Sequence, residues 1–488
     1  MQLDVVFVNP GARRQVYQQL GGELTAVEPP TWAGMLATFC RQRGHSVDVI
    51  DAEALDLSPD ATGLEVAARS PRLAVLVVYG HQPSASTQTM TAAGEALRAI
   101  AEHAPEVPTL IVGGHVSALP EQTLREERVD YVCEGEGPQT LAQLLDVLKA
   151  GDLSHLSSVA GLWYRDGGRI VRSAERAGLV DLDADLPGIA WDLLPMDRYR
   201  AHNWHCFDHI DQRQPYASLY TSLGCPFRCS FCCINAPFGK SGIRYHSPAQ
   251  VIAELDVLVN DYGVRNLKIV DEMFVLSRRH VEGICDGIIE RGYDLNIWAY
   301  ARIDTVKEGL LPKMKRAGFN WLALGIESGS EHVRDGAEKA FGKADIAEVV
   351  RQIQDHGIYV IGNYIFGLPD DDRESMQATL DLALDLNTEF ANFYSAMAYP
   401  GSPLYRLALE KGIELPEAWF AYSQHAYETL PLATETLSAA EVLRFRDDAF
   451  HTYFTSPSYL ALVERKFGPH TLAHVREMAG HRLPRKYA

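Results

Sequence analysis

The sequence predicts an α/β protein: an N-terminal doubly wound parallel sheet, then a full or partial (β/α) barrel, then a small helical region. Strand and helix patterns alternate over residues 1–150 and again over 216–415 of the 488-residue chain. Apolar strands separated by amphipathic helices are typical of parallel sheets whose faces are covered by helices. Residues 151–215 interrupt the alternation and are predicted to be a linker, whereas 416–488 shows only helical patterns.

Short apolar segments predict the strands of the first domain, and amphipathic patterns such as 33–43 and 86–103 predict helices between them. Doubly wound sheets bind ligands at the carboxyl ends of their strands. Glycine and small polar residues follow these ends, so we expect a ligand site there. The predicted strands are residues 5–8, 47–50, 73–78, 109–112 and 131–133.

The linker contains a short hairpin pattern around Asp166-Gly167-Gly168. The stretch LPGIAWDLLPMDRY follows it and is rich in proline and aromatic residues. We expect this segment to pack between the two domains.

The second domain repeats the strand–helix unit along its length, with helical patterns at 248–260, 279–291 and 345–356. Such a series predicts a full or partial barrel with its active site at the carboxyl ends of the strands. The predicted strands are residues 217–221, 266–270, 296–301, 321–325, 359–365 and 390–395.

Composition excludes several classes of protein. The formal net charge of −19 argues against a nucleic-acid-binding surface, which would be basic. The N-terminal residues MQLDVVFVNPG do not form a signal peptide, and no apolar run reaches the about 18 residues of a membrane helix. We therefore expect a cytoplasmic protein without nucleic-acid or membrane partners. The 8 cysteines are then expected to be metal ligands or core residues rather than disulfides.

Three cysteines form the most specific motif in the chain. Residues 223–233 read LGCPFRCSFCC, which places Cys225, Cys229 and Cys232 just after a predicted strand. Thiolates at this short spacing select iron–sulfur clusters, zinc or copper(I). A zinc knuckle is the alternative, but it needs a fourth ligand and no second ligand pair follows. Three ligands leave one iron of a 4Fe–4S cluster open to bind a cofactor or substrate.

This motif and the barrel pattern resemble the radical S-adenosylmethionine (SAM) superfamily over residues 216–415. The resemblance implies that the open iron binds the amino and carboxylate groups of SAM. One electron from the cluster then yields methionine and a 5′-deoxyadenosyl radical. An external electron donor such as a flavodoxin or ferredoxin is implied as a partner.

The resemblance also implies SAM-binding residues at the strand ends. Asp271 and Glu272 replace the usual Gly-Gly-Glu motif, and either carboxylate can bind the amino group of SAM; a helix N-cap pair is the alternative. For Arg302, a carboxylate of SAM or substrate competes with a surface salt bridge. The implied SAM-binding residues, which include an aromatic beside the adenine and candidates for the ribose hydroxyls, are Phe231, Asp271, Glu272, Tyr300, Arg302, Glu327, Ser328, Gly362 and Gly367.

The first domain lacks G-x-G-x-x-G after its first strand, so a dinucleotide is not expected. It resembles the cobalamin-binding domain that precedes many radical SAM enzymes, and residues 441–483 resemble the helical tail of those enzymes. The matching segments are Pro29-Pro30-Thr31-Trp32, Arg43-Gly44-His45, Gly113-Gly114-His115 and Glu134-Gly135-Glu136-Gly137.

One departure concerns the lower face of cobalt. The Asp-x-His-x-x-Gly motif, whose histidine ligates cobalt in methionine-synthase-like domains, is replaced by Asn-Pro-Gly-Ala-Arg-Arg. The prediction is base-off cobalamin without a histidine ligand from that motif. His81 and Gln82 lie near a strand end and are candidates for the lower face; the alternative for His81 is loop packing. The implied cobalamin-binding residues are Asn9, Pro10, His81, Gln82, Ser84, Ser86, Thr87, Gly113, Gly114, His115, Glu134, Gly135, Glu136 and Gly137.

The leading functional hypothesis is a cobalamin-dependent C-methyltransferase. Methylcobalamin and a 5′-deoxyadenosyl radical would together methylate an unactivated carbon of a small metabolite held between the domains. Cyclisation, ring rearrangement or oxidation without methyl transfer is the second hypothesis. A non-catalytic iron–sulfur electron carrier is the third. A methylthiotransferase would need a second cysteine triplet, and Cys40, Cys133 and Cys206 are too far apart in sequence to suggest one.

Overall fold

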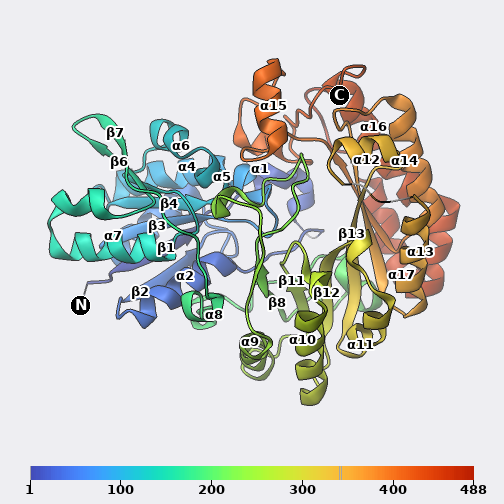
Figure 1. Cartoon of the computed structure of the whole chain (residues 1–488), viewed down its shortest axis with the longest axis horizontal. Coiled ribbons are helices and arrows are strands. Elements are labelled where there is room, and N and C mark those ends of the chain that lie inside the picture. Colours follow the sequence, from blue (N-terminus) through green and yellow to red (C-terminus); the bar gives the residue numbers. More distant parts are fainter. Residues whose placement is uncertain (1, 23, 340, 342) are drawn as a thin grey trace.

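The computed structural model describes residues 2–22, 24–339, 341 and 343–488. The two sheets lie side by side, and helices of the C-terminal region cover the outer side of the second sheet (Figure 1). This arrangement follows from the alternating strand and helix patterns, since each parallel strand needs a crossover connection.

The first sheet has seven strands in the order β2-β1-β3-β4-β5-β6-β7. The first five strands in the chain are parallel, and their order changes direction between β1 and β3. The hairpin predicted inside the linker adds two antiparallel strands to β5, so part of the linker belongs to this sheet. The strands are β1 (Val5–Asn9), β2 (Val47–Asp51), β3 (Leu73–Val78), β4 (Thr109–Gly113), β5 (Tyr131–Cys133), β6 (Leu162–Asp166) and β7 (Arg169–Arg172).

Helices cover this sheet because its strands are apolar on both sides. Every residue of β3, for example, is buried. The helices are α1 (Arg13–Tyr17), α2 (Thr31–Gln42), α3 (Pro59–Arg69), α4 (Ala85–His103), α5 (Gly114–Ala118), α6 (Pro120–Glu126) and α7 (Pro138–Ala150).

The second sheet is a partial barrel of six parallel strands in the order β15-β14-β13-β12-β11-β8. Its two edge strands, β8 and β15, do not pair with each other, so the barrel is open on one side. The strands are β8 (Tyr216–Leu219), β11 (Asn266–Ile269), β12 (Asn296–Arg302), β13 (Phe319–Glu327), β14 (Tyr359–Phe366) and β15 (Phe390–Ser395).

Helices connect these strands and continue into the C-terminal region. The long last helix is interrupted at Gly468, whose φ of 83° lies in the left-handed region that glycine tolerates. No helix in the described part of the chain is long and apolar enough to cross a bilayer. The helices are α8 (Leu182–Asp185), α9 (Pro248–Asn260), α10 (Arg278–Arg291), α11 (Leu311–Arg316), α12 (Glu331–Gly336), α13 (Lys343–Asp355), α14 (Arg373–Leu386), α15 (Pro403–Lys411), α16 (Ala439–Phe454) and α17 (Pro457–Gly480).

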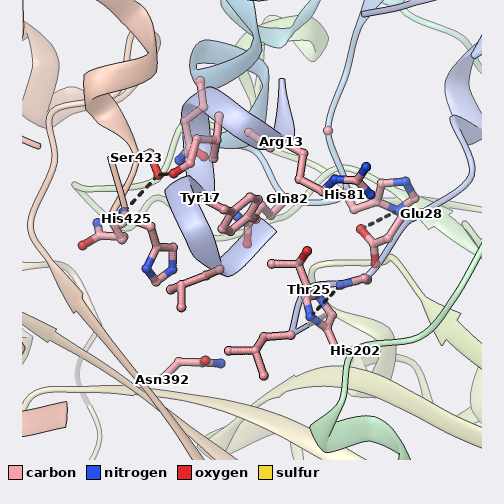
Figure 2. A pocket seen from close by; sticks show the side chains of 18 of the residues that line it. Arg13, Tyr17, Thr25, Glu28, His81, Gln82, His202, Asn392, Ser423 and His425 are labelled. Atoms are coloured by element: carbon pink, nitrogen blue, oxygen red, sulfur yellow. Dashed lines mark hydrogen bonds and ion pairs between the residues drawn. The ribbon is translucent and has the colours of Figure 1, made fainter. Parts of the chain in front are cut away.

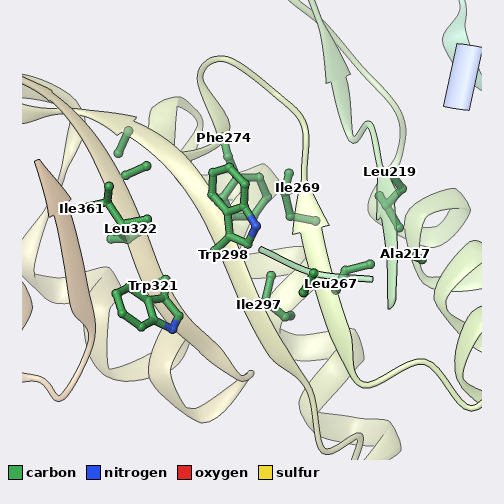
Figure 3. Close-up of a cluster of buried hydrophobic side chains, with 14 of the residues drawn as sticks. Ala217, Leu219, Leu267, Ile269, Phe274, Ile297, Trp298, Trp321, Leu322 and Ile361 are labelled. Atoms are coloured by element: carbon green, nitrogen blue, oxygen red, sulfur yellow. The ribbon is translucent and has the colours of Figure 1, made fainter. Parts of the chain in front are cut away.

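Aromatic side chains close the amino end of the barrel. Figure 3 shows Trp298 and Trp321 projecting from neighbouring strands into the apolar core. Trp204, from the linker, lies between them, with ring centroids 5.0 Å from Trp298 and 5.8 Å from Trp321. This part of the linker therefore packs against the amino end of the barrel.

We expect Trp204→Ala to destabilise the barrel. Trp204 is buried, and removing such an indole costs about 3–5 kcal/mol through lost transfer energy and a cavity. The midpoint of urea unfolding of the apoprotein, followed by far-UV circular dichroism, should fall clearly. Leu409→Ala, at a side chain that is 58% exposed, is the control and should leave the midpoint unchanged. Equal midpoints for both variants would contradict a role of Trp204 in stabilising the barrel.

Candidate functional site

A cavity of about 500 Å³ lies between the first domain, the barrel and the C-terminal region. Residues at the carboxyl ends of β1 and β3 line one side of it, including Asn9, Pro10, His81 and Gln82. This is the point where the strand order of the first sheet changes direction, which is where doubly wound sheets bind ligands. The predicted ligand site and the observed cavity coincide at these residues.

A second, smaller cavity of about 40 Å³ joins the first domain to the cysteine loop. Gln82 and Gly114 line it from the first domain, and Gly224, Cys233 and Glu272 line it from the barrel. The two predicted cofactor regions therefore face a common space.

Ser86, Thr87 and His115 form a buried network behind these strand ends. The Ser86 hydroxyl donates to the Val78 carbonyl and accepts from the His115 backbone N–H at 2.9 Å. The His115 Nδ1 lies 3.2 Å from the Thr87 hydroxyl, and burial lowers the His115 pKa to about 3. These side chains hold the loops after β3 and β4 together, and the imidazole that takes part is neutral. Ser84 lies directly before α4, at its amino end.

The glycines at these ends permit close backbone approach. A Cβ on Gly113 would lie 2.4 Å from the Val78 carbonyl oxygen, and Gly114 lies beside Ser86. Gly135 and Gly137 have φ values of 105° and 107°, which disfavour other residues.

Protein groups already pair with the two glutamates beside these glycines. Glu134 accepts hydrogen bonds from Trp163 and Arg172 of the hairpin β6–β7. Glu136 accepts from the Leu179 backbone N–H at 2.6 Å and from Arg244 at 3.0 Å. Glu136 therefore links the first domain to the barrel domain.

A buried polar cluster lines the large cavity where the first domain meets the barrel, and sequence analysis did not identify it as a whole. Figure 2 shows Glu28, His81 and His202 on one side of this cavity. Glu28 accepts hydrogen bonds at 2.9 Å from Lys268 of β11 and from the Tyr216 hydroxyl of β8. Burial acts to raise the pKa of Glu28, but its imidazole and ammonium neighbours outweigh this and hold the pKa well below its usual value. Glu28 is thus ionised. In the sequence, only a lysine inside the apolar strand LKIV indicates this cluster.

His81 is oriented by this cluster rather than free. Its Nε2 donates to the Pro29 carbonyl at 2.7 Å, and its Nδ1 lies 3.3 Å from the Ser218 hydroxyl. Burial lowers the His81 pKa to about 4, so the ring is neutral near pH 7.

The cysteine loop connects two short antiparallel strands, β9 (Ser222–Leu223) and β10 (Arg244–Tyr245). Gly224 precedes Cys225 with a φ of 89°, and a Cβ there would lie 2.5 Å from the Gly242 carbonyl oxygen. Cys225 is buried, whereas Cys229 and Cys232 are half-buried. The loop thus holds Cys225 firmly and presents the other two thiols.

Asp271 fixes the start of this loop. Its carboxylate accepts three hydrogen bonds of 2.6 Å, from the Thr221 backbone N–H, the Thr221 hydroxyl and the Ser222 hydroxyl. Glu272 has no hydrogen-bond partner among the described residues and faces the smaller cavity. Burial raises the Glu272 pKa to about 7. Of the two neighbouring carboxylates, Glu272 alone is free to take a ligand.

Arg302 lies against the cysteine loop. Its guanidinium forms a bidentate pair with Asp304, at 2.9 and 3.1 Å, and donates to the Cys229 thiol at 3.6 Å. It also stacks 4.0 Å above the Phe227 ring. These contacts show a salt bridge within the site rather than on the surface.

The remaining predicted SAM residues differ in their surroundings. Glu327 pairs with Lys339, whose ammonium lies 5.9 Å from the ring centre of Phe231. Ser328 is fully buried and bonded to Thr379 at 3.1 Å. Tyr300 lines the large cavity.

The two glycines of β14 and its following loop face away from the barrel interior. A Cβ on Gly362 would lie 2.7 Å from the Tyr364 ring, while its neighbour Ile361 lines the cavity. A Cβ on Gly367 would lie 2.5 Å from Val442 of α16. Both positions are therefore held by packing.

Within the described ranges, no three or more His, Cys, Asp or Glu side chains gather around a single point as a one-ion site requires. Three cysteines of a 4Fe–4S cluster bind three different irons, so they do not need to gather in this way. The loop geometry is compatible with such a cluster.

Two sequence families match the chain in the order of its domains. Residues 18–145 match the B12 binding domain family, and residues 219–383 match the radical SAM superfamily. An uncharacterized methyltransferase of Pyrococcus horikoshii is 31% identical over 397 residues, which cover 81% of this chain and 82% of the relative. The anaerobic magnesium-protoporphyrin IX monomethyl ester cyclase of Cereibacter sphaeroides is 26% identical over 445 residues, covering 90% and 68%.

Solved structures share the whole fold. The radical SAM methyltransferase TsrM from Kitasatospora setae superposes with a TM-score of 0.70 at 16% identity, covering 98% of this chain and 100% of that one. The cobalamin-dependent radical SAM enzyme OxsB gives a TM-score of 0.71 at 16% identity, covering 98% and 72%. With both domain families in order and a relative aligned over most of both chains, the protein belongs to the cobalamin-dependent radical SAM enzymes.

Proposed function

We propose that this enzyme is a C-methyltransferase that methylates an unactivated carbon of a small metabolite. One observation carries the proposal: the strand ends of the first domain and the cysteine loop line the same small cavity, which lies beside the larger one. When bound, the cluster supplies the electron that cleaves SAM, and cobalamin supplies the methyl group. A substrate in the larger cavity lies between the two domains, which excludes water and restricts its orientation.

The residues around the cysteine loop fit SAM. Glu272 is a half-buried carboxylate with no hydrogen-bond partner among the described residues, and an ammonium group would satisfy it. Asp271 acts instead as a positioning residue, because its oxygens already accept bonds from Thr221 and Ser222. Phe231, Arg302 and the pair Glu327–Lys339 lie within or against the cysteine loop and complete the proposed SAM site.

The strand ends of the first domain fit a large planar cofactor. Gly114 and Gln82 line the smaller cavity, and the larger cavity opens directly beyond β1 and β3. Both ring nitrogens of His81 contact protein groups, which supports cobalamin without a histidine ligand at this position. Gln82 lines both cavities and is the residue we propose for the lower face.

Radical cyclisation without methyl transfer is the second candidate, because a relative over 90% of this chain is a cyclase. The same residues would serve both reactions, so the two reactions are distinguished by their products.

Methyl transfer is tested with SAM that carries a trideuterated methyl group. The reduced, anaerobic holoenzyme should form S-adenosylhomocysteine and move label into the cobalamin fraction, even without substrate. Mass spectrometry of both fractions is the measurement, and cluster-free protein is the control. Formation of 5′-deoxyadenosine alone, with no S-adenosylhomocysteine, would reject methyl transfer and favour the cyclase-type reaction.

Asp271→Asn is expected to impair assembly of the cluster. An amide offers one acceptor atom in place of two, so hydrogen bonds that fix residues 221–222 are lost. Iron and sulfide content after anaerobic reconstitution should drop to less than about half of the wild-type value. Asp294→Asn changes an exposed aspartate paired only with Arg265, so it should load normally. Full iron content in Asp271→Asn would refute the positioning role.

Glu272→Gln is expected to keep the cluster but weaken SAM binding about tenfold, since a charge-assisted hydrogen bond is lost. The wild-type affinity should rise between about pH 6 and 7.5, because the raised pKa of about 7 means that the carboxylate becomes charged over this range. Equilibrium dialysis of SAM at several pH values measures both effects. The variant should show a flat profile; a profile like that of the wild type would exclude Glu272.

A further inference from the structure

One end of the large cavity is lined by the C-terminal region, and it contains a buried arginine that the proposed reaction does not use. Arg446 of α16 lines this end together with Tyr17, Tyr394 and His425. Figure 2 shows His425 and Tyr17 across the cavity from the Glu28 cluster. The two ends of the cavity therefore differ in chemistry.

Arg446 is held rigidly and keeps one nitrogen free. Its side chain is 8% exposed. Nε donates to the Phe393 carbonyl at 2.7 Å, and Nη1 donates to Asp447 at 2.7 Å. Nη2 has no hydrogen-bond partner within the described residues, although the side chain borders the cavity. A guanidinium is donor-only and remains charged, so this nitrogen requires an acceptor.

The charge of Arg446 is not balanced by the protein. Asp447 also accepts two hydrogen bonds of 2.9 Å from Arg485. The remaining nitrogen of Arg485 donates to the Ala426 carbonyl and the Thr429 hydroxyl. Two guanidinium groups thus share one carboxylate, which leaves a net positive charge next to the cavity. At the opposite end, Lys268 and Glu28 neutralise each other.

Neighbouring groups add further donors. The hydroxyls of Tyr17 and Tyr394 have no hydrogen-bond partner in the described ranges, and both side chains line the cavity. The Nδ1 atom of His425 is buried and has no hydrogen-bond partner in the part of the chain that the structure describes, and its ring stacks on Tyr17 at 5.4 Å. Burial raises the pKa of Tyr394 above its usual value, and among its neighbours Tyr17 also raises that pKa while Arg446 lowers it, so these groups act on one another electrostatically.

We propose that this end of the cavity binds an oxyanion of the substrate, a carboxylate or a phosphate-type group, with Arg446 as its principal contact. The inference rests on the proposed function, since it assigns a class of substrate to that reaction: an anion with an apolar body that packs among Tyr17, Tyr394 and Phe450. The uncompensated charge of Arg446 selects such a molecule by charge as well as by shape.

The phosphate in the nucleotide tail of cobalamin is a second oxyanion that has the chemistry to bind Arg446. The position of Arg446 favours the substrate, because α16 packs on β15 of the barrel rather than on the first sheet. The test therefore uses holoenzyme already saturated with cobalamin and SAM.

The probes are anilinonaphthalene sulfonate, an aromatic anion, and phenylnaphthylamine, its uncharged counterpart. Equilibrium dialysis against the holoenzyme gives the affinity for each, and no turnover is needed. The result is therefore independent of whether methyl transfer occurs. Arg446→Met should weaken sulfonate binding about tenfold and leave the amine unaffected. Arg446→Lys should restore most of the sulfonate affinity.

Two further variants separate charge from packing. Asp447→Asn removes the shared carboxylate and should tighten sulfonate binding without tightening amine binding, whereas partial unfolding exposes apolar surface and would increase binding of both probes. Arg444→Met changes an exposed arginine on the same helix that does not line the cavity, so it should have no effect.

The proposal is overturned if wild-type holoenzyme shows no saturable sulfonate binding. It is also overturned if both probes lose affinity equally in Arg446→Met, or if Asp447→Asn weakens sulfonate binding. Binding that appears only when cobalamin is omitted would assign Arg446 to the cofactor and reject the substrate role.

Discussion

The position of the cysteine loop depends on one buried carboxylate. Asp271 ends the strand next to β8 and accepts three short hydrogen bonds from the residues that lead into the loop. Burying such a group is costly unless its oxygens are satisfied, so the loop and the strand end stabilise each other. Glu272, the next residue, lies in the turn that follows and lines the smaller cavity.

Much of the fold could be predicted from the sequence because parallel strands buried on both faces are continuous apolar runs. The runs at β3 and β15 match the structure at both ends. Strand ends also predict where ligands bind, so the cysteine loop and the glycines at the ends of β4 and β5 can be identified from the sequence alone. The hairpin β6–β7 was recognised, but its pairing with β5 was not, because local patterns do not encode which sheet a hairpin joins.

The site was less predictable where partners come from distant segments. Glu28 and Lys268 are 240 residues apart, and only the fold brings them together. Arg446 looks like an ordinary polar residue on an amphipathic helix, and its burial depends on Phe393 and Asp447. In contrast, the short-range motif of Cys225, Cys229 and Cys232 is carried by one loop, which is why spacing alone identifies it.

The ion pairs Glu28–Lys268 and Glu136–Arg244 each join the first domain to the barrel domain. Removing one partner of a buried pair leaves an uncompensated charge, which costs about 3–5 kcal/mol. One domain therefore cannot readily be replaced by the corresponding domain of a related enzyme. A chimera that combines the first domain of one enzyme with the barrel of another would keep its interface only if both halves of each pair were transplanted together.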